Sequence, residues 1–273
     1  MKSHLSGAIA LENERSLQRL IRAIALSQGN FALILVRCNY IQLRDQMLKN
    51  LRHNTPNLEI QEIFLSPSVT TLHTTIASTL SGNPASVMVF GLESVHAQDD
   101  VIAGINKARD IYAASFPFPL VLWLSDEVVT AFSRLAPDFK SWGATTIKFE
   151  MATTDLITLI RHETDCLFTK VIESGSQRFL SNASIYLDPK SQQRHEIETA
   201  RNDLHRLHGV KIEADLEASL EFVLGRDAYA NDQIDLALSH YQRARAFWRS
   251  TEETESGGVG EWGSVRLEDA NSV

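Results

Sequence analysis

The pattern of apolar and polar positions divides the chain into two parts. From residue 9 to residue 151, short apolar runs alternate with segments whose apolar residues recur at helical spacing. The runs are FALILVR, LEIQEIFL, SVMVFGLE, FPLVLWLS and TTIKFEM, and most are continuous, as expected of strands buried on both faces. This alternation predicts an α/β fold with a doubly wound, mostly parallel sheet. Residues 97–115 and 126–137 are expected to form one helix each, the second ended by Pro137.

From residue 152 onward the strand pattern is lost, and the remaining apolar residues follow helical spacing. A helix is expected at 153–175, and another is expected to begin near Asp188 and Pro189 and to end at Gly209. Two further helices surround the tripeptide AND at 230–232. We therefore predict an α/β domain at 1–151, a helical linker region at 152–209, a helical hairpin at 210–250 and a disordered tail at 251–273.

Charge and composition narrow the classes of partner. The 273 residues carry a formal net charge of -8, which argues against a nucleic-acid binder, because such affinity comes largely from Lys and Arg. No apolar stretch approaches the roughly 20 residues that span a bilayer, and the N-terminus lacks the apolar core of a signal peptide. Cys38 and Cys166 lie too far apart for a zinc-ligand spacing. A cytoplasmic protein without a membrane partner is predicted.

The end of the chain resembles one tetratricopeptide repeat. The residues that carry the resemblance are Leu224, Gly225, Ala237, Tyr241 and Ala244, in which small residues sit where two helices cross and the aromatic ring fills the gap beside them. The repeat's first-helix aromatic is replaced by Ala228 and its closing proline by Arg249. A plain helical hairpin is the alternative. Because a single repeat cannot bury its own face, this unit would pack on the preceding helices, form a homo-oligomer or cap an array.

Residues 9–151 resemble the N-terminal domain of bacterial, cyanobacterial-type proteins that join a STAND-like P-loop NTPase module to tetratricopeptide repeats. The stretches that carry this resemblance are LENERSLQRLIRAIALSQGNFALILVRCNY, FPFPLVLWLSDEVV and RLAPDFKSW. The last is the most distinctive, and its motif residues are Arg134, Pro137, Asp138, Phe139 and Trp142. The resemblance implies a P-loop NTPase-like fold with a nucleotide crevice at the carboxyl ends of the strands.

The phosphate loop that such a fold needs is degenerate. A working loop reads G-x-x-x-x-G-K-[ST], in which glycines let backbone N–H groups wrap the phosphates, Lys supplies charge and the hydroxyl binds magnesium. After the first strand the chain instead reads Arg37, Cys38, Asn39 and Tyr40, without glycine, lysine or a magnesium-binding hydroxyl. Arg37 or Arg44 could contact a phosphate, although solvated charges are the simpler interpretation.

Two other strand ends complete the predicted vestigial crevice. Glu93 comes two residues after the end of its apolar run, later than a magnesium-supporting carboxylate usually does, and Ser125 is either a polar sensor residue or the cap of the next helix. His205 and His208 share a helix face, but the neighbouring basic residues favour solvated histidines over a metal site. No catalytic residue, metal or required cofactor is predicted, and the crevice could bind ADP or ATP only weakly.

The hypothesis that fits these patterns is a non-catalytic interaction or regulatory scaffold with a protein partner that the sequence does not identify. The alternative from the enzyme class is a divergent nucleotide-binding NTPase or nucleotide-sensing switch, in which arginine replaces the missing lysine. A third hypothesis is a dimerisation module that acts through its C-terminal hairpin.

Overall fold

The computed structural model describes residues 2–143, 145–173, 192–208 and 212–254. The chain forms two compact units, residues 1–152 and residues 153–273. Of the predicted features, the helix start at Asp188 and Pro189 and the tail beyond Thr254 lie outside the described residues.

The first unit is an α/β fold built on a five-stranded, all-parallel sheet, as the sequence predicts. The strands are β1 (Ala32–Arg37), β2 (Ile60–Phe64), β3 (Ser86–Phe90), β4 (Pro119–Leu124) and β5 (Ile147–Lys148). Their order across the sheet is β2-β3-β4-β1-β5, so the first strand of the chain lies inside the sheet and β2 and β5 form its edges. Each of the five apolar runs of the sequence therefore supplies one strand.

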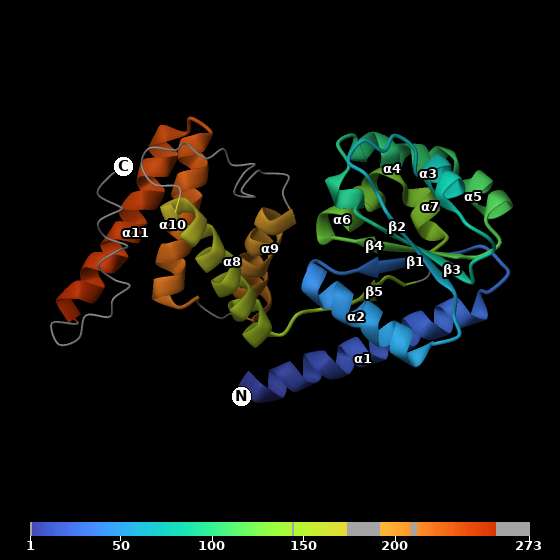
Figure 1. Ribbon diagram of the computed structural model, residues 1–273, viewed down its shortest axis with the longest axis horizontal. Coiled ribbons are helices and arrows are strands. Elements are labelled where there is room, and N and C mark those ends of the chain that lie inside the picture. The colour runs from blue at the N-terminus through green and yellow to red at the C-terminus, as the bar shows by residue number, and fades with distance from the viewer. Residues whose placement is uncertain (1, 144, 174–191, 209–211, 255–273) are drawn as a thin grey trace. The chain divides into compact units, whose positions relative to one another are not determined.

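Helices cover both faces of this sheet (Figure 1). One face carries α1 (Lys2–Leu26) and α2 (Ile41–Asn54), and the other carries α3 (Leu72–Thr79), α4 (Gln98–Lys107), α5 (Arg109–Ser115), α6 (Asp126–Leu135) and α7 (Pro137–Ser141). A short 3₁₀ turn, η1 (Leu92–Ser94), follows β3. The chain crosses the sheet in one direction from β1 to β2 and in the opposite direction afterwards. Because such crossovers are right-handed, the two directions place their helices on opposite faces.

The two faces bury different side chains. Beneath α3 to α7, alternate strand residues such as Leu35, Val89 and Leu122 join one apolar core with the helix residues that cover them. On the other face, aromatic rings stack in a row across the strands, with ring-centroid distances of 4.8 Å, 5.9 Å and 5.6 Å between successive members. This aromatic row consists of Phe64, Phe90, Trp123 and Phe149.

One of the expected helices in this unit is divided, and the predicted stop at Pro137 is confirmed. The helix expected over residues 97–115 breaks at Ala108 into α4 and α5, because Tyr112 and Phe116 turn into the core, where both rings contact His73. Pro137 ends α6 near the expected place, but it also begins α7. Proline suits this first helical position, where its missing N–H leaves no hydrogen bond broken.

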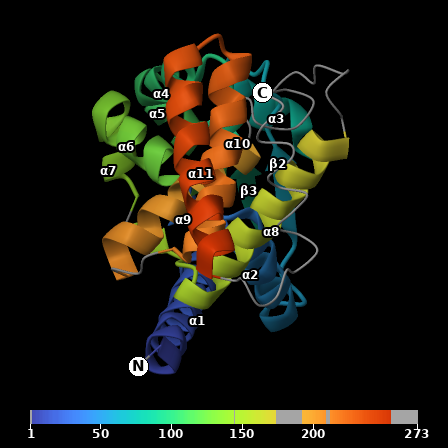
Figure 2. The same ribbon diagram turned by 90° about the vertical axis from the view of Figure 1, so that its left-hand side faces the viewer.

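The second unit is helical throughout its described residues. It contains α8 (Thr153–Glu173), α9 (Gln192–His208), α10 (Ala214–Ala230) and α11 (Ile234–Thr254). Helices α10 and α11 form an antiparallel hairpin (Figure 2), and an aromatic cluster of Phe168, Phe222 and Trp248 joins them to α8. Because α11 continues to Thr254, residues 251–254 are helical rather than the start of a disordered tail. Among the described helices, none is both long and apolar enough to cross a membrane.

Buried charges also hold this helical unit together. The carboxylate of Glu221 on α10, which is 5% exposed, accepts from Arg201 on α9 at 3.2 Å and contacts His240 and Arg243 on α11 at 2.7 Å and 3.1 Å. A second buried carboxylate, Asp227, also pairs with an arginine of α9, and burial raises its pKa. The α9, α10 and α11 helices are therefore joined through charged groups as well as apolar contacts.

Candidate functional site

The carboxyl ends of β1 and β4 form the place where this type of sheet would bind a ligand. The two strands are neighbours, and the helices that follow them, α2 and α6, leave toward opposite faces (Figure 1). Open α/β sheets bind ligands in the crevice at such a switch point. The residues that end β1 and begin α6 therefore decide what this crevice can hold.

Protein groups join the ends of β1 and β4, where the predicted crevice would lie. Arg37, the last residue of β1, forms a bidentate ion pair with Asp126, the first residue of α6. The two side chains are 19% and 32% exposed, so the pair is partly shielded from water. Asn39 adds a second bridge, because its Oδ1 accepts from the backbone N–H of Asp126 at 2.9 Å. Arg37 and Asn39, both predicted crevice residues, are therefore directed at the same acidic residue.

Ser125 and Cys38 complete the connection between the two strands. The Oγ of Ser125 accepts from the backbone N–H of Val128 at 3.4 Å, so Ser125 caps α6, which was one of its two predicted roles. The backbone N–H of Cys38 donates to the carbonyl oxygen of Leu124 at 2.9 Å, which extends the β1–β4 pairing beyond the strand. Free N–H groups at a helix start are what attracts anions, and the start of α6 uses two of them internally.

The loop between β1 and α2 is short. Only Cys38, Asn39 and Tyr40 separate the strand from the helix, and Tyr40 is 3% exposed. The Tyr40 side chain makes no capping hydrogen bond to α2. This loop is too short to contain the phosphate-binding motif, and its predicted residues lie in the core or against neighbouring strands.

The two remaining predicted crevice residues lie apart from the bridge. Arg44 on α2 places its guanidinium 5.2 Å from the ring centroid of Phe90 and 6.0 Å from that of Phe64, and it pairs with Asp45 at 3.1 Å. Its side chain is 16% exposed, so it covers one end of the aromatic row rather than facing open solvent. Glu93 lies on η1 after β3, and β4 separates β3 from β1.

The residues of the RLAPDFKSW motif have structural roles. Arg134 pairs with Asp99 of α4 at 3.0 Å, and the Asp138 carboxylate accepts from Asn106 of α4 at 3.3 Å. Phe139 is fully buried, whereas Trp142 is 38% exposed. The Arg134–Asp99 pair therefore connects α6 to α4, and the Asn106–Asp138 hydrogen bond connects α7, which begins at Pro137, to α4.

In the second unit, Gly225 of α10 lies directly against the ring of Tyr241 on α11. A Cβ placed on Gly225 of α10 would lie 2.8 Å from the ring of Tyr241 on α11, which is far inside contact distance. Ala237 and Ala244, on the same face of α11, are 2% and 0% exposed. Leu224 is half-buried. The hairpin therefore depends on the absence of a side chain at residue 225.

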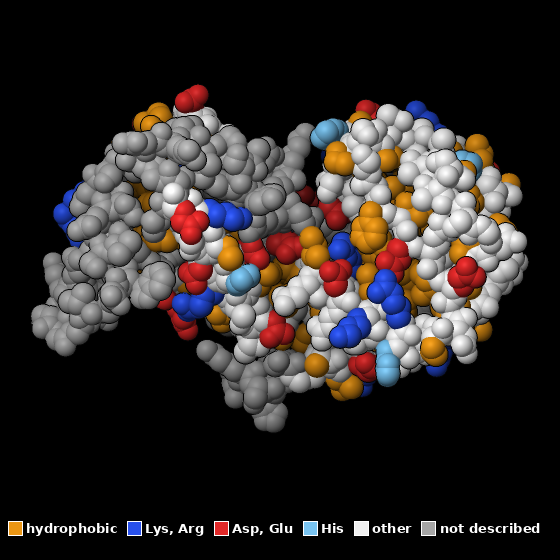
Figure 3. Space-filling view, in the orientation of Figure 1, with side chains coloured by type: hydrophobic (Ala, Val, Ile, Leu, Met, Phe, Trp, Pro, Cys, Tyr) orange, Lys and Arg blue, Asp and Glu red, His pale blue; other side chains and the backbone are white. Residues whose placement is uncertain are grey.

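The surface offers few other candidate sites. Within the described ranges, no group of three or more His, Cys, Asp and Glu side chains is arranged to hold a metal ion. On the face of the α/β unit turned to the viewer in Figure 3, Lys and Arg side chains are mixed with Asp and Glu side chains, so positive charge does not gather there. Comparison of the chain with protein-family models, curated proteins and solved structures gave no match.

The sequence pointed to most of these positions but missed Asp126. Its only visible signal is that an acidic residue follows the end of an apolar run, which equally fits the first turn of a helix. Its pairing with Arg37 depends on β4 lying beside β1, and the order of the segments along the chain does not reveal that neighbourhood.

Proposed function

We propose that this protein is a non-catalytic interaction or regulatory scaffold that works in the cytoplasm. In this proposal the α/β unit derives from a STAND-type P-loop NTPase whose nucleotide crevice has been closed, and the C-terminal hairpin is a tetratricopeptide-like module. The strand–loop–helix order of β1 and α2 is the arrangement in which such proteins carry their phosphate loop.

The Arg37–Asp126 pair is the observation that carries the proposal. An NTPase stabilises developing negative charge with preorganised donors and a metal ion. Here the arginine at the end of β1 is already neutralised by a carboxylate, and a phosphate entering the crevice would meet that carboxylate as a like charge. The alternative, a divergent NTPase that uses arginine in place of lysine, requires Arg37 or Arg44 to leave its present contacts.

The working surface in this proposal is the outer side of the hairpin. Ile234, Leu236 and Leu238 of α11 are 55%, 47% and 54% exposed. Leu236 lies on the opposite side of the helix, whereas Ile234 and Leu238, four residues apart, share one face and form an exposed apolar pair there. We expect a protein partner, or a second copy of the chain, to cover them.

Titration calorimetry with ATP and with ADP, each with and without magnesium, tests the closed crevice. The wild-type protein should release no binding heat at high-micromolar concentration. Micromolar binding that depends on magnesium, and that is lost in Arg37→Ala but kept in Arg134→Ala, would establish the NTPase alternative instead. Arg134 is the matched control because it also pairs with an aspartate but lies outside the crevice.

Sedimentation velocity over a range of concentrations tests the hairpin. Self-association that Leu238→Glu abolishes and Leu26→Glu leaves intact would identify a second copy as the occupant, because Leu26 is an equally apolar and more exposed residue of α1. A monomer at all concentrations would direct the search to a different protein.

A further inference from the structure

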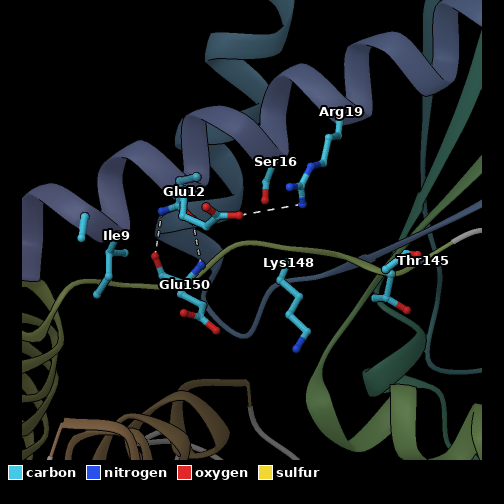
Figure 4. Close-up of a pocket in the computed structure, with 10 residues that line it drawn as sticks. Ile9, Glu12, Ser16, Arg19, Thr145, Lys148 and Glu150 are labelled. Carbon is cyan, nitrogen blue, oxygen red and sulfur yellow. Dashed lines mark hydrogen bonds and ion pairs between the residues drawn. The ribbon is translucent and has the colours of Figure 1, made fainter.

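A cavity of about 400 Å³ lies between α1 and the outer edge of β5. Side chains of α1 form one wall, and the strand segment 145–150 forms the other (Figure 4). None of the residues discussed as part of the crevice or the hairpin lines it. Its size falls in the range of about 300–1,000 Å³ that is usual for ligand sites.

The backbone at this edge is directed alternately inward and outward. The N–H of Phe149 donates inward, to the carbonyl oxygen of Arg37 on β1, at 3.0 Å. The N–H and C=O of Glu150 face outward, toward α1, where the side-chain amide of Asn13 accepts from one at 3.0 Å and donates to the other at 2.8 Å (Figure 4). Because strand residues alternate, the N–H and C=O of Lys148 also face outward.

Asn13 thus makes the pair of hydrogen bonds that a neighbouring strand would make. It does so at one position only, and β5 is the last strand of the sheet. The next outward position, Lys148, borders the cavity. An edge with outward N–H and C=O groups is a template for a further strand.

We propose that the groove between α1 and β5 binds an extended peptide segment of a partner protein, which adds a strand antiparallel to β5 at Lys148. In this mode, main-chain hydrogen bonds supply the affinity and alternate side chains supply the specificity. The proposal concerns a surface separate from the crevice and the hairpin, so it does not depend on the proposed function.

The charges along the groove define the direction and chemistry of the peptide. Glu12 and Arg19 of α1 pair with each other at 3.8 Å, so the charges left to orient a peptide are those of the strand segment, with Glu150 toward one end and Lys148 toward the other (Figure 4). A peptide antiparallel to β5 enters at the Glu150 end and leaves at the Lys148 end. It is therefore held best when a basic residue precedes an acidic one, since opposite charges across neighbouring strands attract. The parallel direction would reverse this order.

The test is fluorescence anisotropy with the full chain and a labelled, end-blocked peptide, Lys-Thr-Val-Thr-Glu. Its control is the reversed peptide, Glu-Thr-Val-Thr-Lys, which has the same composition. We expect the first peptide to bind about tenfold more tightly than the second. A copy methylated on its backbone nitrogens should not bind. Equal binding of the two peptides, or binding of the methylated copy, would overturn the proposal.

Two variants of Lys148 separate the backbone from the charge. Lys148→Pro removes the outward N–H and leaves the bond from Phe149 to β1 in place, and proline is tolerated at such edge positions. Lys148→Ala keeps the N–H and removes the charge. The proline variant should lose binding, whereas the alanine variant should weaken it only severalfold. Circular dichroism shows whether each variant is folded. If the proline variant is unfolded, the methylated peptide still tests whether binding needs the backbone hydrogen bonds.

A small-molecule site is the competing explanation of the cavity. If free lysine or glutamate displaced the labelled peptide at concentrations similar to those of the unlabelled peptide, the groove would be a pocket for a small charged molecule. That result would also contradict strand addition.

Discussion

Replacing Gly225 with alanine should destabilise the helical hairpin, although alanine is the better helix former. In the interior of a helix this change is worth about 1 kcal/mol in favour of alanine. Here the new Cβ would lie 2.8 Å from two ring carbons of Tyr241 and 3.2 Å from the Cβ of His240. Relieving such overpacking costs about 1–3 kcal/mol. The difference leaves the hairpin roughly 1 kcal/mol less stable.

Hydrogen exchange measured by mass spectrometry reports this change locally, because peptides from α10 and α11 are read separately from those of the α/β unit. A loss of that size should raise the exchange rate of the hairpin amides about fivefold. The matched control is Gly104→Ala in α4, where the added Cβ meets nothing within 4 Å beyond its chain neighbours and the backbone of its own helix. At that position only the higher helix propensity of alanine acts, so hydrogen exchange in α4 should become slower by a similar factor.

A second background isolates the ring as the cause. In a Tyr241→Ala protein, both ring contacts at 2.8 Å are removed and only the 3.2 Å contact with the Cβ of His240 remains, which a shift of a few tenths of an ångström relieves. Gly225→Ala should then stabilise the hairpin relative to that background. The sign of the effect should therefore reverse between the two backgrounds. If Gly225→Ala slowed exchange in the wild-type protein as Gly104→Ala does in α4, the argument from close helix crossing would be refuted.

Three further predictions concern other contacts. A double-mutant cycle of Arg37→Ala and Asp126→Ala, followed by urea unfolding, should give a coupling free energy of about 1–3 kcal/mol, as expected of charge-assisted hydrogen bonds, and a value near zero would contradict the bridge. Burial raises the pKa of Tyr241 to about 12, above its usual value of 10.0, so the folded state should lose stability as the pH rises through that interval. The melting temperature of Tyr241→Phe should therefore fall less than that of the wild-type protein between pH 10.0 and about pH 12. Asn13→Ala should lower the free energy of unfolding by about 2 kcal/mol, because it leaves both backbone groups of Glu150 without the amide, and an unchanged urea midpoint would show that water replaces it.

The strands and the parallel sheet could be predicted from the sequence because they depend on local pattern. Each apolar run has enough β-branched and aromatic residues to specify a buried strand. The break at Ala108 was missed for the opposite reason. Its neighbours are good helix formers, but Arg109 lies within 3.6 Å of Asp138 and Tyr112 enters the core, so tertiary contacts override helix propensity.

The site was harder to predict because its parts meet only through the order of the strands. Arg37 and Asp126 both follow strand ends, and nothing in the chain order places those strands side by side. Asn13 gave a signal that the sequence interpretation did not use. It continues the apolar stripe of Leu17, Leu20 and Ile24 four residues earlier, and a polar residue in a buried stripe requires a partner. That partner, Glu150, is 137 residues away and could not be named.

On the proposed function, placing the phosphate-loop residues after β1 would not by itself give a nucleotide site. A lysine and glycines placed after β1 would still face Asp126, whose carboxylate accepts both arms of Arg37. Binding a phosphate there means either separating that pair and leaving a carboxylate beside an anion, or leaving the arginine neutralised. Both choices cost electrostatic free energy in a partly shielded site. On the proposed function, the loss of the phosphate loop and the presence of Asp126 belong together, because the residue that closes the crevice is tolerable only where no phosphate is to be bound.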